Sequence, residues 1–364
     1  MRKGWEYKKL GEVLETTSGG TPSKSHKEYY EGGTIPWLRS GEVSKGDIYD
    51  AELYITEEGL KKSSAKLFPI DTVLIAMYGA TVGQVGILKS TMCTNQAICG
   101  ILPNKDFHPN FLKYVLLANK KNYLKQAIGG AQPNISQQVI KSTYIPVIKF
   151  SEQESIVSEL DKINELIRLK KEQLKDFDNL AQSLFYEMFG DPVENEKGWE
   201  VKKLGEVYKM KSGDSLSTKN FIEGNIPVYG GNGISGYHNQ YNKDGSYIII
   251  GRVGVYCGNA RIVKGQFWLT DNAFELFYDK SIQNEVFVCK LLNLLNLRQY
   301  ANAAAQPVIS NNTLKHISIP LPPLSLQRLF AQRIEQIERE KSEVQKSIQD
   351  LETLLASRMQ YWFE

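Results

Sequence analysis

The sequence predicts an α+β protein in which two similar globular units alternate with two long helices. The helices form an antiparallel coiled coil, and the whole chain is a pseudo-two-fold internal repeat. Two observations lead to this fold class. A heptad pattern of apolar residues occurs twice at an offset of 174 residues, and the segments that precede the two patterns resemble each other. With 364 residues, the chain is also too long for a single hydrophobic core.

The heptad pattern divides the chain. Apolar residues alternate at spacings of four and three over residues 151–189 and again over residues 325–363. Seventeen of the twenty seam positions are apolar, whereas the chain average of 41% would give about eight. The apolar seam positions that define the prediction are Ile156, Leu160, Ile163, Ile167, Leu174, Phe177, Phe330, Ile334, Ile337, Val344, Ile348 and Leu351.

Three further seam positions are basic, namely Lys170, Lys341 and Arg358. A polar seam residue either fixes the register of the two helices or lies at a solvated edge of the seam. We expect the solvated edge for Arg358, which lies near the end of the chain.

Capping signals set the helix ends. Ser151 and Glu154 form a capping box at the start of the first helix, and Ser325 is the counterpart of Ser151, although Arg328 replaces the glutamate. The first helix should stop at residues 190–192, Gly-Asp-Pro. Each seam spans 33 residues, or about 50 Å of helix.

Connectivity predicts that the helices run antiparallel. If the unit between them is compact and has neighbouring ends, the second helix begins where the first one ends. The alternative is that each helix packs separately on its own unit.

The globular units are duplicated. The motif Gly-Trp-Glu-x-Lys-Lys-Leu-Gly-Glu-Val occupies residues 4–13 and 198–207. Shorter matches follow, at Thr-Asn-Gln-Ala (94–97 with 270–273) and at Ala-Gln-Pro-x-Ile-Ser (131–136 with 305–310). The predicted domains are 1–149, 150–190, 191–323 and 324–364.

The two units differ in one part. The first unit carries about twenty additional residues between Gly11 and Gly79, and the intervening sequences bear little likeness to those of the second unit. The units therefore share a scaffold and differ in a variable segment. Within the units, strands are expected at 72–76, 246–250 and 260–263, and one helix per unit at 110–128 and 285–300.

Composition excludes several classes of protein. The four cysteines form no CxxC pair and the four histidines are scattered, so we expect neither disulfides nor a metal site. The chain begins without an apolar signal region and has no apolar run long enough to span a bilayer, which predicts a cytoplasmic protein.

Charge is unevenly distributed. The two helical segments sum to −5, whereas the rest of the chain carries 33 basic and 25 acidic residues, a net charge of +8. This distribution favours globular units that contact a polyanion and helices that do not. The alternative is that the charges only solvate the surface.

The sequence contains no recognisable catalytic motif. The segment 19–25 resembles a phosphate-binding loop but lacks the glycine before its lysine, and the glycines of 230–233 and 251–254 lack dinucleotide-binding spacing. The sequence also lacks the Asn/Asp-Pro-Pro-aromatic tetrapeptide of an amino-methyltransferase. We therefore expect a non-catalytic protein with no cofactor of its own.

Loops rich in Gly, Asn, Tyr and Arg occur in both units. Arg, Asn and Gln offer paired hydrogen bonds to base edges, and glycines let the backbone approach phosphates. On this basis the candidate DNA contacts are Trp37, Arg39, Ser40, Tyr78 and Gln84 in the first unit, and Tyr229, Asn232, Tyr237, His238 and Arg252 in the second.

The whole arrangement resembles the specificity subunits of Type I restriction-modification systems. Those proteins have two target recognition domains that alternate with two helical regions, and each domain opens with a stretch like that at residues 4–13 and 198–207. Further phrases typical of the family are Ile35–Glu42, Tyr78–Gly83, Ile145-Pro146 with Gln153, Ile226–Gly233, and Ile319–Leu324 with Gln327.

This resemblance implies a non-enzymatic subunit that recognises a bipartite, asymmetric target in double-stranded DNA. It also implies two modification subunits, which carry S-adenosylmethionine and methylate adenine, and ATP-driven restriction subunits that join through them. An alternative is a stand-alone protein, encoded for example by a mobile element, that binds DNA and redirects or inhibits a host system. A fused methyltransferase or nuclease is disfavoured by the missing motifs.

Overall fold

A computed structural model describes residues 2, 4–129, 132–302 and 306–364. The chain divides into two compact units, the first made of residues 1–169 and 347–364 and the second of residues 170–346. Both boundaries fall inside the long helices, so each unit contains part of each helix. The two units are described separately.

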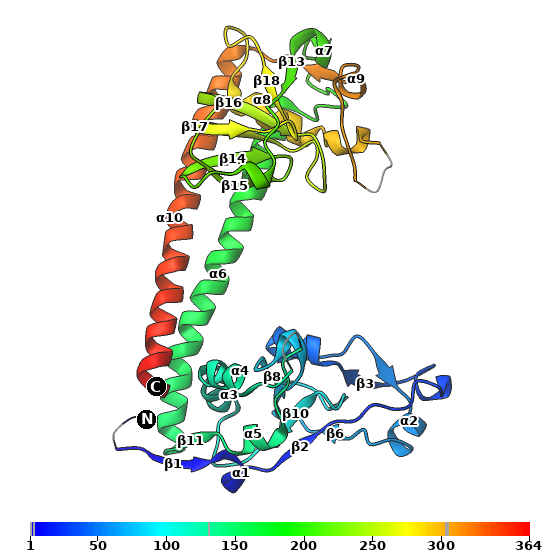
Figure 1. The fold of residues 1–364 in the computed structure, drawn as a ribbon, viewed down its shortest axis with the longest axis vertical. Helices are drawn as coiled ribbons and strands as arrows, with labels where there is room; N and C mark the ends of the chain where they lie inside the picture. Colours follow the sequence, from blue (N-terminus) through cyan, green and yellow to red (C-terminus); the bar gives the residue numbers. More distant parts are fainter. Residues whose placement is uncertain (1, 3, 130–131, 303–305) are drawn as a thin grey trace. The chain divides into compact units, whose positions relative to one another are not determined.

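The long helices are α6 (Phe150–Phe189) and α10 (Leu324–Phe363), each of 40 residues (Figure 1). They begin and end within one residue of the predicted positions. None of the twelve apolar seam side chains is exposed, because each is buried or half-buried. The heptad pattern thus marks the face that each helix turns away from solvent.

In the first unit, the start of α6 packs against the end of α10. Arg358 donates hydrogen bonds to both carboxylate oxygens of Glu159, and the indole nitrogen of Trp362 donates to the same carboxylate at 3.1 Å. The hydrogen bonds from Arg358 hold the pKa of Glu159 below its usual range. Arg358 therefore joins the two helices, while 30% of its side chain stays exposed at the edge of the seam, so the expected solvated edge is only part of its role.

In the second unit, the end of α6 packs against the start of α10. The ammonium of Lys341 lies 2.7 Å from a carboxylate oxygen of Asp178, and the rings of Phe185 and Phe330 are 5.6 Å apart. Since start meets end in both units, the helices run antiparallel. The alternative in which each helix packs separately is wrong.

The ends of the helices also complete the core of each unit. In the first unit, Leu160 of α6 is buried with Phe111 in one cluster. In the second unit, Phe185 packs against Phe287 and Phe330 within a larger aromatic cluster. Burial of one such side chain stabilises the fold by about 1.5–3 kcal/mol. Each helix end is therefore part of a globular core as well as of the coiled coil.

The first unit contains a five-stranded sheet of order β2-β10-β7-β8-β4, a four-stranded sheet of order β5-β3-β9-β6, and the pair β1-β11. Its strands are β1 (Glu6–Lys9), β2 (Thr16–Ser18), β3 (Ile35–Leu38), β4 (Asp47–Ile48), β5 (Tyr54–Ile55), β6 (Leu67–Phe68), β7 (Val73–Ala76), β8 (Val85–Leu88), β9 (Met92–Thr94), β10 (Ile98–Ile101) and β11 (Tyr144–Val147). Its helices are α1 (Leu10–Val13), α2 (Glu57–Lys61), α3 (Pro109–Ala118), α4 (Lys120–Gln126) and α5 (Gln137–Lys141), with 3-10 turns η1 (Lys27–Tyr29), η2 (Ser40–Lys45) and η3 (Gly79–Thr81).

The second unit contains a six-stranded sheet of order β13-β18-β16-β17-β14-β15 and the pair β12-β19. Its strands are β12 (Val201–Lys203), β13 (Lys209–Ser212), β14 (Ile226–Gly230), β15 (Gly233–His238), β16 (Lys243–Gly251), β17 (Ala260–Leu269), β18 (Ala273–Phe277) and β19 (Ser318–Pro320). Its helices are α7 (Leu204–Val207), α8 (Glu285–Leu294) and α9 (Asn311–Leu314), with 3-10 turns η4 (Thr218–Asn220) and η5 (Leu297–Tyr300). The predicted α+β class with its internal repeat is confirmed.

The helix predicted before each Gln-Pro motif is interrupted. In the first unit it divides into α3 and α4 at Asn119, whose side-chain amide donates to the carbonyl of Val115 at 2.9 Å. In the second unit α8 gives way to η5 at Asn296, which has a φ of 46°. Asparagine tolerates this left-handed conformation better than most residues do, so the chain turns there.

The duplicated opening motif forms the same structure in both units. The amide of Leu10 donates to the carbonyl of Thr143 at 2.8 Å, and the amide of Leu204 donates to that of Ile317 at the same distance. The glycine that follows each leucine packs closely on a lysine. A Cβ atom at Gly11 would lie 3.0 Å from Cβ of Lys141, and one at Gly205 would lie 2.7 Å from Cβ of Lys315.

A buried glutamine clamps the start of each long helix. The side-chain oxygen of Gln153 accepts from the amide of His108 at 2.8 Å, and its NH₂ group donates to the carbonyls of Asp106 and Ile148. Gln327 repeats this arrangement, with its partners at Asn284, Ile282 and Pro322. Both side chains are fully buried.

Among the residues that the structure describes, no helix is long and apolar enough to cross a membrane. The same residues contain no group of three or more His, Cys, Asp or Glu side chains placed to hold a metal ion.

Candidate nucleic-acid interface

The variable segment of the first unit forms a polar hollow. The hollow has a volume of about 520 Å³ and its lining includes Arg39, Ser40, Lys45, Glu52 and Asn95. The structure thus brings together two of the predicted contacts, Arg39 and Ser40. The side-chain oxygen of Asn95 is buried there without a hydrogen-bond partner among the described residues.

Ion pairs hold the basic residues of this hollow. A guanidinium nitrogen of Arg39 lies 2.8 Å from a carboxylate oxygen of Glu52, and the ammonium of Lys45 lies 3.2 Å from one of Glu42. The hydrogen bond from Arg39 is the main cause that lowers the pKa of Glu52. Arg39 is about half exposed, so its guanidinium is positioned yet accessible.

Trp37 belongs to the core of the first unit. Only 4% of its surface is exposed, and its indole nitrogen donates to the carbonyl of Gly20 at 2.9 Å. Its ring also packs at right angles to that of Tyr30, with centroids 6.1 Å apart. The side chain has no free edge for a base, so Trp37 supports the strand that leads into Arg39.

Tyr78 and Gln84 flank the 3-10 turn η3, which packs beside η2, the turn that carries Ser40 and Lys45. Tyr78 is 40% exposed and begins the loop of residues 78–83, which we call the Gly loop, and half-buried Gln84 follows this loop. Among the described residues, no hydrogen bond or ring contact joins either side chain to the hollow around Arg39.

The Gly loop is clasped by the Gln-Pro motif. The amide of Gly79 donates to the carbonyl of Pro133 at 2.8 Å, and in the second unit Gly254 donates to Pro307 at 3.0 Å. We call these paired contacts the clasp. The first residue of each Gln-Pro motif, Ala131 or Ala305, lies outside the described residues.

The second unit has a counterpart of the Gly loop at residues 253–258, and Asn232 and Arg252 lie beside it. Asn232 forms the exposed turn between β14 and β15, and its side-chain oxygen accepts from the amide of Tyr256 at 3.4 Å. Arg252 is half-buried. It donates to the hydroxyl of Ser212 at 3.3 Å, and its guanidinium lies over the ring of Phe274 at 5.4 Å.

The remaining candidates of the second unit lie on the β14–β15 hairpin. Tyr237 is 55% exposed, whereas Tyr229 is half-buried and packs against Phe267. His238 is only 4% exposed, and its Nδ1 accepts a hydrogen bond from the amide of Ile222 at 3.0 Å. His238 therefore stabilises the β14–β15 hairpin by its hydrogen bond to Ile222. Like Trp37, it has little exposed surface with which to contact a base.

Sequence analysis missed Asn95, Lys45 and Glu52 as members of the first hollow. A signal existed for Asn95, because it lies in the duplicated Thr-Asn-Gln-Ala motif. In the second unit this motif begins at Thr270, and a guanidinium nitrogen of Arg252 lies 3.4 Å from the carbonyl of Asp271. The duplicated motif therefore adjoins a candidate arginine in both units.

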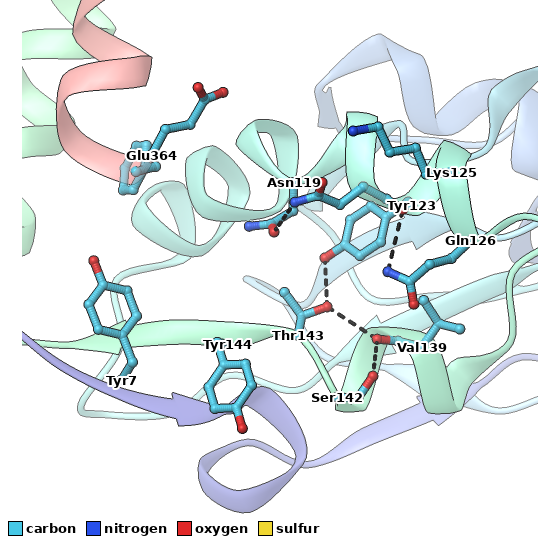
Figure 2. Close-up of a pocket in the computed structure, with 12 residues that line it drawn as sticks. Tyr7, Asn119, Tyr123, Lys125, Gln126, Val139, Ser142, Thr143, Tyr144 and Glu364 are labelled. Carbon is cyan, nitrogen blue, oxygen red and sulfur yellow. Dashed lines mark hydrogen bonds between the residues drawn. The ribbon is translucent and has the colours of Figure 1, made fainter. Parts of the chain in front are cut away.

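A second hollow recurs in both units. In the first unit it measures about 600 Å³ and lies between α4, the β1–β11 pair and the last residues of α10 (Figure 2). Figure 2 shows Lys125 and Gln126 on α4, with Tyr7 and Tyr144 from the two strands. In the second unit a hollow has a volume of about 490 Å³, and five of its seven lining residues, including His316 and Ser318, lie 174 positions after residues that line the first hollow.

The duplicated architecture matches a known protein family. The family model of the Type I restriction modification DNA specificity domain matches residues 2–176 and 196–353. The chain belongs to the Type I restriction-modification specificity subunit family. Because the family model matches once in each half, the internal repeat corresponds to two copies of the DNA specificity domain.

Relatives agree with this assignment. The chain is 28% identical to the Type I restriction enzyme EcoprrI specificity subunit of Escherichia coli over 90% of this chain and 86% of that protein. It is 32% identical to the MjaIX specificity subunit of Methanocaldococcus jannaschii over 62% of this chain and 56% of that protein.

Two solved structures share the fold. The Type I restriction-modification S subunit from M. genitalium superposes with a TM-score of 0.59 at 17% identity, over 99% of this chain and 96% of that chain. A chain from a structural study of complex assembly and conformational transition in the type I R-M system gives 0.65 at 21% identity, over 100% and 98%. The function of the family is DNA target recognition within such a system.

Proposed function

We propose that this specificity subunit recognises a bipartite, asymmetric site in double-stranded DNA, with one half-site for each unit. The main support is a shared scaffold that carries unlike variable segments. The helix clamp and the clasp recur in both units, whereas the variable segment supplies three strands of a four-stranded sheet in the first unit and the β14–β15 hairpin in the second. One scaffold with two different surfaces suits two unlike half-sites.

Base recognition in the first unit is assigned to the hollow around Arg39, Ser40 and Asn95. Arginine pairs with the edge of guanine and asparagine with that of adenine, through two hydrogen bonds each. Tyr78 and Gln84 remain candidates for a separate contact in this unit. Trp37 is assigned a supporting role because it is buried.

In the second unit, Asn232 and Arg252 supply the same two chemistries beside the Gly loop. Tyr229 and Tyr237 lie on the hairpin that carries Asn232 and are candidate contacts for base edges or sugar. His238 is assigned to the support of that hairpin.

The chain acts in this proposal without catalysis of its own. It holds two adenine-N6 methyltransferase subunits on the target, and restriction subunits join through them. S-adenosylmethionine and ATP then belong to those partners, and the complex works in the cytoplasm. The support is that the relatives are specificity subunits of restriction enzymes. The stand-alone alternative has no support among the comparisons.

The proposal is tested by mapping methylated adenines in a host with and without this gene, and by co-purification of the chain with a methyltransferase. We expect one bipartite sequence with unlike halves to lose methylation when the gene is removed. Methylation that is independent of the gene, or a target with identical halves, would contradict the proposal.

A further inference from the structure

Each unit contains a long stretch without a single acidic residue. Residues 107–151 hold six lysines and no Asp or Glu, and residues 286–334 hold five Lys or Arg and no Asp or Glu. The chain has 41 acidic residues in 364, so about five would be expected in the shorter stretch. The two stretches overlap under the repeat offset of 174, which makes the feature common to both units.

Within the described part of the chain, no ion pair holds the cations of these acid-free stretches, although Asp178 and Glu338 act on Lys290 at longer range. Among the residues that the structure describes, no acidic side chain lies within ion-pair distance of any of them. In contrast, Arg39 and Lys45 of the variable segment are held by Glu52 and Glu42. The cations of the two stretches are Lys113, Lys120, Lys121, Lys125, Lys141, Lys149, Lys290, Arg298, Lys315, Arg328 and Arg333.

Several of these cations are accessible, and one pair is equivalent under the repeat. Lys121 and Lys125 are exposed and stand four residues apart, so they share one face of α4. In the second unit Arg298 and Lys315 are exposed, and Lys315 is the repeat counterpart of Lys141. Lys125 lines the hollow of the first unit (Figure 2), and Arg298 and Lys315 lie in sequence between residues that line the hollow of the second unit.

A feature common to both units cannot distinguish two unlike half-sites. It must instead contact something that is the same at both. A group of cations without ion-pair partners favours a polyanion, although Glu364 borders the first hollow. Glu285 and Glu335 also lie near Arg328.

Hydrogen bonds next to the clasp indicate which polyanion these cations contact. The amide of Ile309 donates to the carbonyl of Arg252 at 3.0 Å, and that of Ile135 donates to the carbonyl of Met77, beside Tyr78, at 2.9 Å. The acid-free stretches are thus hydrogen-bonded directly to the candidate base-recognition loops.

We propose that the acid-free stretches 107–151 and 286–334 hold the phosphodiester backbone of double-stranded DNA beside each half-site, independently of base sequence. The proposal rests on DNA target recognition and adds a division of labour within each unit. Variable segments, in which ion pairs position the side chains, select the bases. The acid-free stretches supply affinity by displacing counterions from phosphates, an effect that is identical on all sequences.

The test uses the full chain in complex with its modification subunits. Two double variants remove the exposed cations, Lys121→Gln with Lys125→Gln in the first unit and Arg298→Gln with Lys315→Gln in the second. A control, Lys162→Gln with Lys346→Gln, removes the same charge from exposed positions on the long helices. For each protein, the affinity for the target duplex and for a duplex with scrambled half-sites is measured against salt concentration.

We expect the slope of log K against log salt to fall by about 0.9 for each neutralised contact, or about 1.8 for each double variant. The fall should be equal on target and scrambled DNA, so the ratio of the two affinities stays within about twofold. The control should retain the original slope.

Three outcomes would overturn the proposal: an unchanged slope, a loss confined to target DNA, or release of the modification subunits with the slope intact. The last outcome would assign the surface to an acidic protein partner instead. Preference of the unaltered complex for target over scrambled DNA tests target recognition separately, so failure of one is distinguishable from failure of the other.

Discussion

Replacement of Gln153 with leucine removes the clamp at the start of α6 without a large change in volume. The amide of His108 and the carbonyls of Asp106 and Ile148 lose their hydrogen-bond partners. Each unsatisfied backbone group costs about 1–3 kcal/mol, and the lower end applies because these groups are only part-buried. The substitution should therefore destabilise the first unit by about 3 kcal/mol. Gln327→Leu should do the same in the second unit.

Hydrogen exchange followed residue by residue measures this effect. In Gln153→Leu, the amides of α3 and the start of α6 should exchange faster by about two orders of magnitude, since 1.4 kcal/mol corresponds to a factor of ten. The amides of the second unit should be unchanged. In a methylation assay, recognition of the half-site that belongs to the first unit should be lost, and recognition of the other half-site should remain.

Gln332→Leu is the matched control, because Gln332 is exposed on α10 and should change stability by less than about 0.5 kcal/mol. The reasoning fails if Gln153→Leu destabilises the first unit by less than about 1 kcal/mol, or if it accelerates exchange equally in both units.

Further substitutions test the candidate contacts and the seam. Arg39→Ala should reduce discrimination at one base pair by about 1–3 kcal/mol if Arg39 grips a guanine edge, and Arg252→Ala should do so in the other half-site; a uniform loss on all sequences would make either residue a phosphate contact. Glu52→Gln removes the carboxylate that positions the half-exposed Arg39, so discrimination at the base pair that Arg39 contacts should fall, and a rise in target affinity would show that Glu52 only competes with DNA for the arginine. Ile167→Glu places a charge in the seam and should abolish methylation of the bipartite site, whereas exposed Lys162→Glu should not; full methylation by Ile167→Glu would reduce the helices to tethers.

Much of the fold was predictable because the long helices follow a heptad repeat. The seam pattern gave both helices to within one residue, and connectivity gave their antiparallel direction. The break at Asn119 was not predictable from periodicity, because the apolar residues of α3 and α4 continue the same pattern across it. The role of Arg358 was also missed, since its partner Glu159 lies 199 residues away in the chain.

The candidate site was predictable in its residue types more than in its positions. Arg39, Ser40, Asn232 and Arg252 occupy polar or half-exposed places, as base contacts require. Trp37 and His238 do not, because aromatic and imidazole side chains serve equally well in a core and at a surface. Their burial depends on partners such as Gly20 and Ile222, which only the folded chain brings near.

The duplicated motifs acquire physical reasons in the structure. Gly11 and Gly205 allow a lysine to pack closely, and the buried glutamines close the start of each helix. These contacts depend on groups far apart in sequence, so the repeat was visible in the sequence but its purpose was not.

The central claim is that each unit recognises its own half-site. Exchange of residues 1–149 for the first domain of another family member, followed by mapping of methylated adenines, tests this claim most directly. Exchange of residues 191–323 is the matched reciprocal experiment. The account predicts that the first exchange changes one half of the target and leaves the other half unchanged, and that the second exchange does the reverse. A change in both halves after either exchange would contradict it.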